Sequence, residues 1–589
     1  MYAAAMQNQY YENNAANNTT TTTSSSPNTS APASVSAPSP GAGGKSVSSS
    51  GFQYIGQSCT ISLIEQIRHL LRTSNSGLTL SNDFLSNSYI DTPYPKTSTY
   101  PIQLPSREQA DRLVNHFVEN IQAITYVFDM DSFYSSINEV YRDPLSTPSS
   151  SLCLLHLVFA LGSVYDDECN VSSDLFFDSG RKLLDEAPID YGEVWVVEAF
   201  LLVYLYHEIK CRRNGSWVEL GKAIRHAQAL GMDRSLANND THRVNLWKSL
   251  YIHDTLTSTY LGRSRIVPRF HLDQSVSPLD HFVSLCNIVG DIHQHIYQST
   301  RFSSNALYGL ITALKDWLSS FQTRTVDVND KLKVLLNLTY LHTIILLTRP
   351  FLFHASVNGY SHKTFNDLAL SCIQSAFSTS KIIVDFNSTL PGLWKSPTIV
   401  YYLFTAGSVL LLYRFRRRNA ITPPSEYSSL IYSALDNTIS HLSKYSDIDT
   451  SAKQFYLTLT ELDDIIKSSS PQAASTEASS PPRSPASENS LMTLATLSEQ
   501  RRSSVVGGTA NQPPTPPPVS PTFTEDEEII KKRRTSSLTS APHIYDNIPV
   551  LGLDNLSLET TNHWTFTSRG PLMTTFDTPI EGVIMTPCY

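Results

Sequence analysis

Seven cysteines are the residues with the widest chemical potential in this sequence, because thiolates can bind zinc, act as nucleophiles or form disulfides. Zinc needs thiolates at short, fixed spacings to complete its tetrahedral shell, whereas the two nearest cysteines here are Cys153 and Cys169. An odd, scattered set is also a poor disulfide framework. We therefore predict that most of these cysteines are buried free thiols in a reducing compartment and that they bind no metal.

Two other short patterns could carry catalytic chemistry. Residues 207–211 read HEIKC, which falls one residue short of the zinc-protease pattern because Cys211 replaces the second histidine. The acidic run 166–168 is similar to the aspartate-rich magnesium motif of helical terpene synthases, but no second acidic block follows it. The sequence contains no phosphate-binding loop, dinucleotide-binding glycine pattern or GxSxG elbow. We predict a solvated loop at 166–168, no catalytic or metal-binding residues, no cofactor and no enzymatic activity.

Charged and aromatic residues on apolar helix faces are the remaining candidates. Arg225 and Asp254 lie on mostly apolar faces of two consecutive expected helices. We hypothesise that they form a buried ion pair that fixes helix register, with a switch or ligand contact as the alternative. Trp217 and Trp247 are predicted to be core aromatics, and the alternative is that they line an inducer pocket.

The elements that must position these residues are helices. Apolar residues recur at helical spacing through residues 104–468, and few strand signals interrupt them. Gly231 and Gly262 stand where a left-handed helix end favours glycine, and Arg349-Pro350 is expected to end another helix. Ser62 and Ser106 are expected to cap the first two helices. The main helices are expected at 61–71, 106–121, 152–164, 195–206, 216–230, 241–261, 279–297, 304–322, 330–347, 364–384, 397–417, 426–444 and 452–467.

Composition divides the chain into five parts around this all-α, multi-helix domain. Residues 1–58 and 469–542 are rich in Ser, Thr, Asn or Pro and are too poor in apolar residues to offset the entropy of ordering them. We expect disorder in both, a linker with a short helix at 59–103, the helical domain at 104–468 and an acidic-hydrophobic tail at 543–589.

Charge and hydropathy bear on two classes of protein, those that bind nucleic acids and those that enter a membrane. The net charge of -9 gives no support for direct nucleic-acid binding by the chain as a whole. A signal peptide is not expected because the amino terminus is polar, and the most apolar stretch, 194–206, is too short to span a membrane. We expect a soluble intracellular protein with no membrane partner.

Four blocks of sequence stand out along the helical domain. They read LPSREQADRL at 104–113, NGSWVELGKAIRHAQALGMDR at 214–234, RVNLWKSLYIHD at 243–254 followed by LGR at 261–263, and LLTRPF at 346–351. In this order and spacing they resemble the fungal-specific transcription factor domain, the regulatory middle region of fungal zinc binuclear cluster transcription factors. Ser264 departs from the family pattern, which usually has proline there. The signature positions, for which the resemblance implies structural roles, are Trp217, Gly221, Arg225, Gly231, Trp247, Asp254, Gly262, Arg263, Arg349 and Pro350.

The resemblance also implies a DNA-binding cluster of six cysteines near the amino terminus, but only Cys59 precedes Leu104. Zinc is therefore expected only for an amino-terminal cluster missing from this chain. DNA would be contacted through that missing finger or through a partner subunit. Transcription machinery or coactivators are the other implied partners, and a small-molecule inducer and a homodimer are further options.

The segment after the helical domain carries two candidate signals. Lys531, Lys532, Arg533 and Arg534 form a candidate nuclear localisation signal, with an incidental charge run as the alternative. Residues 522–530 and the tail mix acidic with apolar residues, a pattern typical of a disordered activation segment or a solvated linker. We predict a nuclear transcriptional regulator of the fungal zinc-cluster family. The alternatives are a helical enzyme with prenyl-type chemistry and a cytoplasmic helical scaffold.

Overall fold

The computed structural model describes the helical part of the chain and one short segment near the carboxy terminus. The predictions for residues 1–54, for the basic cluster 531–534 and for the activation segment 522–530 lie outside the described residues. The described residues are 55–74, 103–144, 146–169, 171–187, 192–237, 240–272, 277–299, 301–324, 329–358, 363–386, 392, 395–418, 425–446, 449–468 and 565–567.

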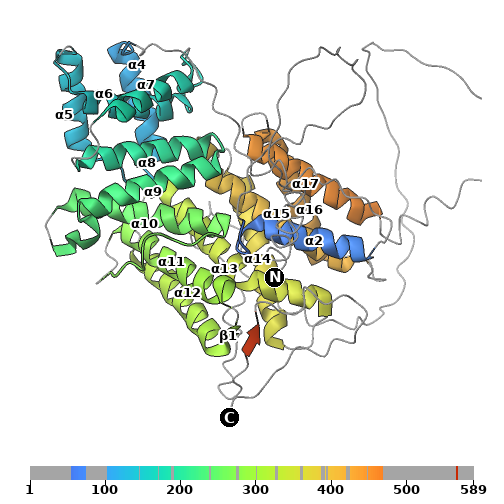
Figure 1. Cartoon of the computed structure of the whole chain (residues 1–589). Helices are drawn as coiled ribbons and strands as arrows, with labels where there is room; N and C mark the ends of the chain where they lie inside the picture. The colour runs from blue at the N-terminus through green and yellow to red at the C-terminus, as the bar shows by residue number, and fades with distance from the viewer. Residues whose placement is uncertain are drawn as a thin grey trace, which may run out of the picture. The chain divides into compact units, whose positions relative to one another are not determined.

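Helices make up nearly all of this described part, so the predicted all-α class is confirmed (Figure 1). The first group is α2 (Thr60–Ser74), α4 (Arg107–Phe117), η1 (Val118–Gln122), α5 (Met130–Arg142), α6 (Ser149–Ser163), α7 (Ser173–Glu186), α8 (Val194–Ile209), α9 (Arg213–Ala229), η3 (Met232–Ala237) and α10 (Thr241–Leu261). The second group is α11 (Pro278–Ile292), η4 (His293–Gln298), α12 (Ser304–Arg324), α13 (Asp330–Asn358), α14 (Lys363–Phe386), α15 (Pro397–Arg417), α16 (Glu426–Tyr445) and α17 (Thr450–Ser468). Among the described residues, β1 (Arg301–Ser303) and β2 (Thr565–Thr567) form one antiparallel pair.

Local capping signals place several of the helix ends. The Ser106 side chain accepts a hydrogen bond from the Gln109 amide at the start of α4, as predicted. Gly231 and Gly262 both adopt left-handed conformations at helix ends, with φ of 67° and 69°. The predicted cap at Ser62 is wrong, because α2 already begins at Thr60 and the Ser62 hydroxyl donates to the Gly56 carbonyl.

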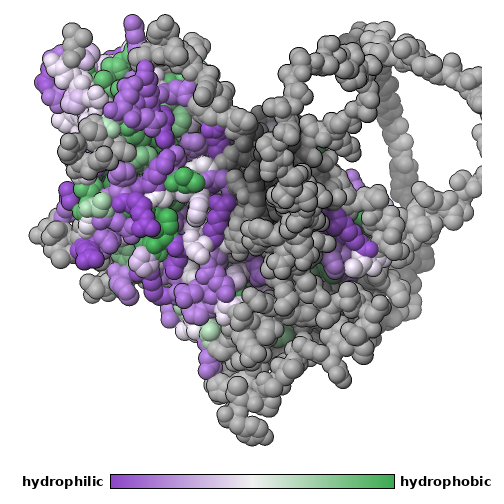
Figure 2. Space-filling view, viewed as in Figure 1, coloured by the Kyte–Doolittle hydropathy of each residue, from purple (hydrophilic) through white to green (hydrophobic). Residues whose placement is uncertain are grey.

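The helices that are apolar all round form the interior. Every residue of α8 from Val196 to Tyr206 is buried, and α8, α9, α10 and α11 pack in succession (Figure 1). The surface coloured in Figure 2 is mostly hydrophilic, with small separated hydrophobic spots. The interior helices therefore account for the long apolar stretches of the sequence.

Two interior helices contain windows long and apolar enough to cross a membrane, Asp330–Phe353 in α13 and Pro397–Arg417 in α15. Both windows lie inside the helical body, where 94% and 89% of their residues are buried. Core helices of globular domains have this combination of length and burial.

The predicted helix end at Arg349-Pro350 is wrong, because α13 continues through Pro350 to Asn358. Proline has no amide hydrogen, so it leaves the carbonyl four residues earlier, that of Leu346, without its helical partner. The Tyr297 hydroxyl donates to this carbonyl at 2.6 Å. A side chain from η4 thus replaces the missing hydrogen bond, which allows the helix to continue.

We expect the substitution Tyr297→Phe to lower the free energy of unfolding by about 1–2 kcal/mol, because it leaves a buried carbonyl without a donor. In a Pro350→Ala background the alanine amide can donate to Leu346, so the same substitution should cost much less. Urea unfolding of the four variants of this cycle measures the coupling. Additive effects would show that the Tyr297 hydroxyl does not compensate for Pro350.

Residues 55–74, which precede the first of the four sequence blocks, are also part of the helical body. The helix α2 packs against α15, and residues 55–59 lie along the end of α10 (Figure 1). The Gly56 amide donates to the Leu261 carbonyl at 3.0 Å, and the Ser58 hydroxyl donates to the Thr259 carbonyl at 2.7 Å. The amino-terminal side of the chain is therefore connected directly to the end of α10.

Candidate functional site

Several signature residues meet where α9 begins and α10 ends. The Arg263 guanidinium lies over the Trp217 ring, 4.8 Å from its centroid, and donates to the Asn214 side chain at 2.6 Å. The Trp217 indole nitrogen donates to the Ser258 hydroxyl at 3.4 Å. Gly262 permits the reversal between α10 and Arg263 because it adopts the left-handed conformation.

Asp254 anchors the segment that follows this reversal. Its carboxylate accepts hydrogen bonds from the amides of Ile266 at 2.8 Å and Val267 at 2.7 Å. The side chain is buried, and burial raises its pKa to about 6 even though both amide bonds act in the opposite direction. Asp254 therefore holds residues 264–268 against α10 through backbone contacts.

The hypothesised Arg225–Asp254 pair is wrong. Arg225 is exposed on α9, where its guanidinium donates to Gln228 at 3.1 Å. The carboxylate of Asp254 is already bonded to amides of its own following loop. The helical spacing of apolar residues correctly predicted that Asp254 lies in the core. It could not predict the partner of Asp254, because no particular residue type marks a backbone amide as a partner.

The remaining signature residues have separate structural positions. Trp247 is buried in the core, whereas Trp217 is only partly buried beneath Arg263. A Cβ added at Gly231 would meet no atom within 4 Å, and one at Gly221 would make an ordinary contact of 3.5 Å with Ile266. Glycine is thus required at Gly231 by its backbone angle and not by space.

The Arg349-Pro350 block connects distant parts of the domain. The Arg349 guanidinium lies 5.0 Å from the centroid of the Tyr297 ring and donates to the Gln57 carbonyl at 2.9 Å. Tyr297 in turn hydrogen-bonds the carbonyl freed by Pro350. The fourth block therefore links α13 to η4 and to the amino-terminal segment.

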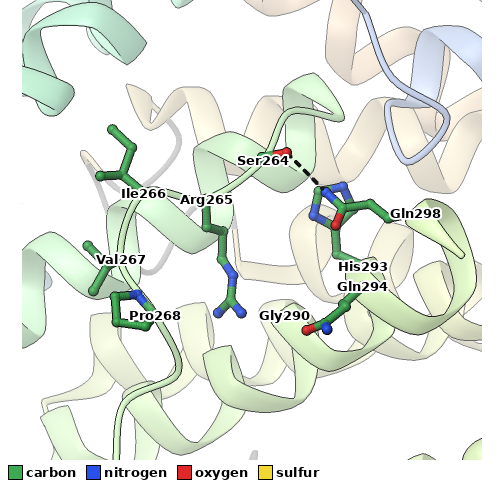
Figure 3. A pocket seen from close by; sticks show the side chains of 9 residues that line it. All are labelled: Ser264, Arg265, Ile266, Val267, Pro268, Gly290, His293, Gln294 and Gln298. Atoms are coloured by element: carbon green, nitrogen blue, oxygen red, sulfur yellow. Dashed lines mark hydrogen bonds between the residues drawn. The ribbon is translucent and has the colours of Figure 1, made fainter.

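The residues Trp217, Ser258, Gly262 and Arg263 are called the signature cluster below. A pocket of about 230 Å³ lies beside this cluster (Figure 3). One wall is the segment anchored by Asp254, and the other is the end of α11 with the π-helical turn η4. Figure 3 shows the Arg265 side chain extending between the two walls. The lining residues are Ser264, Arg265, Ile266, Val267, Pro268, Gly290, His293, Gln294 and Gln298.

Arg265 is fixed in this pocket by a buried network. It donates to the Tyr251 hydroxyl at 3.1 Å, and that hydroxyl donates to Asn287 at 2.6 Å. No sequence pattern marks Arg265, Tyr251 or Asn287 as site residues. The only local indication was the position of Arg265 two residues after Arg263, in a stretch where the usual proline is replaced by Ser264.

A second, narrower cavity of about 70 Å³ lies between α8, α10 and the start of α15. It is mainly apolar, and its polar groups include His253, whose ring nitrogens contact Thr125 and Tyr204 at 3.2 Å each. Burial lowers the pKa of His253 to about 4, so this imidazole is neutral at pH 7. Its small volume leaves little room for an organic ligand.

The two segments that resemble catalytic motifs, 207–211 and 166–168, form structural contacts. Cys211 adopts a positive φ of 58°, and its thiol donates to Asp449 at 2.8 Å. Asp166 is buried and pairs with Arg112 of α4 at 2.8 Å, so the prediction of a solvated loop is wrong for this residue. Within the described ranges, no group of three or more His, Cys, Asp and Glu side chains is arranged to hold a metal ion.

Comparison with known proteins places the cluster inside a known domain. Residues 114–324 match the fungal specific transcription factor domain. This range contains the second and third sequence blocks, the signature cluster and both walls of the larger pocket.

Three relatives are named as regulators. Filamentous growth regulator 27 of Candida albicans is 28% identical over 368 residues, which cover 54% of this chain and 47% of that protein. An uncharacterized transcriptional regulatory protein of Schizosaccharomyces pombe is 25% identical over 434 residues, covering 65% and 54%. The lactose regulatory protein of Kluyveromyces lactis is 23% identical over 180 residues, covering 30% and 20%. This chain thus spans about half the length of the first two relatives.

Proposed function

We propose, on the premise that residues 114–324 are a fungal specific transcription factor domain, that this protein regulates transcription in the nucleus. The observation that carries the proposal is the match of this domain, supported by relatives that are named as regulators. The proposed role is non-enzymatic. The helical domain would receive a signal and pass it to the flanking segments of the chain.

The proposed contact with DNA is made by a zinc cluster outside this chain or by a partner subunit. The cysteines present do not fit such a cluster, because they are far apart in sequence and several are buried free thiols. Burial raises the pKa of Cys153 and of Cys372 to about 12, so both thiols are protonated at pH 7. Zinc binds the thiolate form, which these environments disfavour.

The segments beyond the helical body complete the proposal. The basic cluster 531–534 would direct nuclear import, and residues 522–530 with the tail 543–589 would contact coactivators. Acidic residues next to apolar ones suit this role, because the charge keeps the apolar anchors in water and accessible. The proposal also includes two further partners of the helical domain, a second copy of this chain and a small-molecule inducer.

A tethering experiment tests this function with the full chain. Fused to an unrelated DNA-binding domain, the protein is expected to change transcription of a matching reporter several-fold relative to that domain alone. Removal of residues 522–589 should abolish most of an activating effect, whereas removal of residues 1–50 serves as the matched control. Reporter output equal to that of the DNA-binding domain alone would contradict the proposal.

Imaging separates the nuclear regulator from a cytoplasmic scaffold. The full chain should accumulate in the nucleus, and alanine substitution of residues 531–534 should shift it towards the cytoplasm. A full chain that stays cytoplasmic would favour the scaffold.

A further inference from the structure

We propose that the pocket between residues 264–268 and η4 binds a small anion with a carboxylate or phosphate group, and that this anion is a signal received by the domain. The geometry of the pocket supports the proposed binding site. The signalling role rests on the proposed function.

Arg265 supplies a positive charge that lowers the pKa of the buried Asp254 carboxyl through space but does not form an ion pair with it. Among the described residues, no carboxylate lies within ion-pair distance of its guanidinium. Asp254 is held by backbone amides, and Asp291 pairs with Arg269. Only one donor contact of Arg265 is used internally, the bond to Tyr251, so a fork of N–H groups is left for an oxyanion.

The other polar lining groups suit an anion because none of them carries a negative charge. Ser264, Gln294 and Gln298 offer hydroxyl and amide groups, and the Gln298 amide lies 3.5 Å from the Ser264 hydroxyl across the pocket (Figure 3). Burial, together with a smaller contribution from the Arg265 charge, lowers the pKa of His293 to about 4. His293 is therefore a neutral hydrogen-bonding group at pH 7.

The shape of the pocket limits the size of the ligand. A Cβ added at Gly290 would lie 2.4 Å from the Arg265 guanidinium, so glycine at this position makes room for the side chain. At about 230 Å³ the pocket is smaller than the roughly 300–1,000 Å³ of sites for drug-sized ligands. A small organic acid or a phosphate group is the size that fits. The wall η4 is π-helical, a rare geometry that is frequent at functional sites.

Contacts on both walls connect the pocket with the signature cluster. The amides of Ile266 and Val267 bind Asp254 of α10, and Arg263, just before the pocket, stacks on Trp217 of α9. On the other wall, Tyr297 of η4 bonds the carbonyl freed by Pro350 in α13. An anion that draws the two walls together would therefore act on three helices at once.

Calorimetric titration of the full chain at constant ionic strength tests the site. The probes are inorganic phosphate, malonate and the neutral dimethyl ester of malonate. We expect saturable binding of at least one anion and none of the ester. Arg265→Gln should weaken binding about tenfold or more, because it removes a charge-assisted hydrogen bond. The matched control, Arg269→Gln, removes a nearby charge that already pairs with Asp291 and should change the affinity less than about twofold.

A second variant keeps the test decisive if Arg265→Gln does not fold. Gln294 is exposed at the pocket, so Gln294→Glu should fold, and its carboxylate should pair with Arg265 and exclude the anion. Equal binding of the ester and the anions would overturn the site. So would undiminished anion binding in the Gln294→Glu variant or in a folded Arg265→Gln variant.

Comparison with the tethered reporter distinguishes this inference from the proposed function. A full chain that regulates the reporter but binds neither anion would overturn the anion site and leave the function standing. A chain that binds an anion through Arg265 but never alters the reporter would support the site and contradict the regulatory function.

Discussion

Replacing Gly262 with alanine is expected to destabilise the protein strongly and to release residues 55–59 from the end of α10. Two costs add at this position. A left-handed conformation costs a residue with a Cβ about 1–2 kcal/mol. The new Cβ would also lie 2.3 Å from the Gly56 Cα, where backbone must move, and such overpacking typically costs about 1–3 kcal/mol more.

Gly231→Ala is the matched control for this prediction, because Gly231 has nearly the same φ but open space around its Cα. Thermal unfolding should show a clearly larger loss of midpoint for Gly262→Ala than for Gly231→Ala. Hydrogen exchange should show faster exchange of amides 56–71 only in the Gly262→Ala variant. Equal midpoints with unchanged protection of α2 would refute the close approach of the two glycines.

The second large effect is expected at Asp254. Asp254→Ala removes the acceptor of two backbone amides, and a buried amide without a partner costs about 1–3 kcal/mol. Asp254→Asn keeps a side-chain oxygen that can accept both bonds. We therefore expect the alanine variant to be about 2–5 kcal/mol less stable than the asparagine variant in urea unfolding. Equal stability of the two would show that the amide contacts contribute nothing.

The same residue makes stability depend on pH. Burial raises the folded-state pKa of Asp254 from 3.8 to about 6, so its protonated form favours folding. This contribution is fully present below pH 3.8 and is lost as the pH rises through about 6. Relative to Asp254→Asn, the wild type should therefore lose on the order of 3 kcal/mol between pH 3 and pH 7. A difference between the two proteins that stays constant over this range would contradict the assignment.

Much of the fold follows from local patterns. The start of α4 was predicted from Ser106, the end of α10 from Gly262, and the interior position of α8 from its continuous apolar sequence. These features depend on residues within one or two helical turns, so a single sequence contains the information. The helix α7 was missed because its sequence is polar around Gly180, and glycine disfavours a helix interior. The Gly180 backbone packs closely on the Leu157 side chain, a contact that the sequence does not reveal.

The errors concern contacts between distant residues. Pro350 lacks an amide hydrogen and therefore predicts a helix end, yet Tyr297 supplies the missing donor from 53 positions away in sequence (350 − 297). Arg225 and Asp254 have compatible charges and helix faces, but the carboxylate bonds backbone amides. No local pattern encodes which of several available partners a buried polar group receives.

The sequence by itself determined the helical class, the positions of most helices and the four ordered blocks that resemble the fungal specific transcription factor domain. It also determined that no closely spaced cysteines exist in this chain. Only the tertiary structure decided that residues 55–59 dock on α10, that Asp254 anchors the loop after Gly262, and that Arg265 lies in a pocket where it bonds the Tyr251 hydroxyl. The physical reason is that helix formation depends on near neighbours, whereas burial, pairing and pocket shape depend on segments that meet only when the chain is packed.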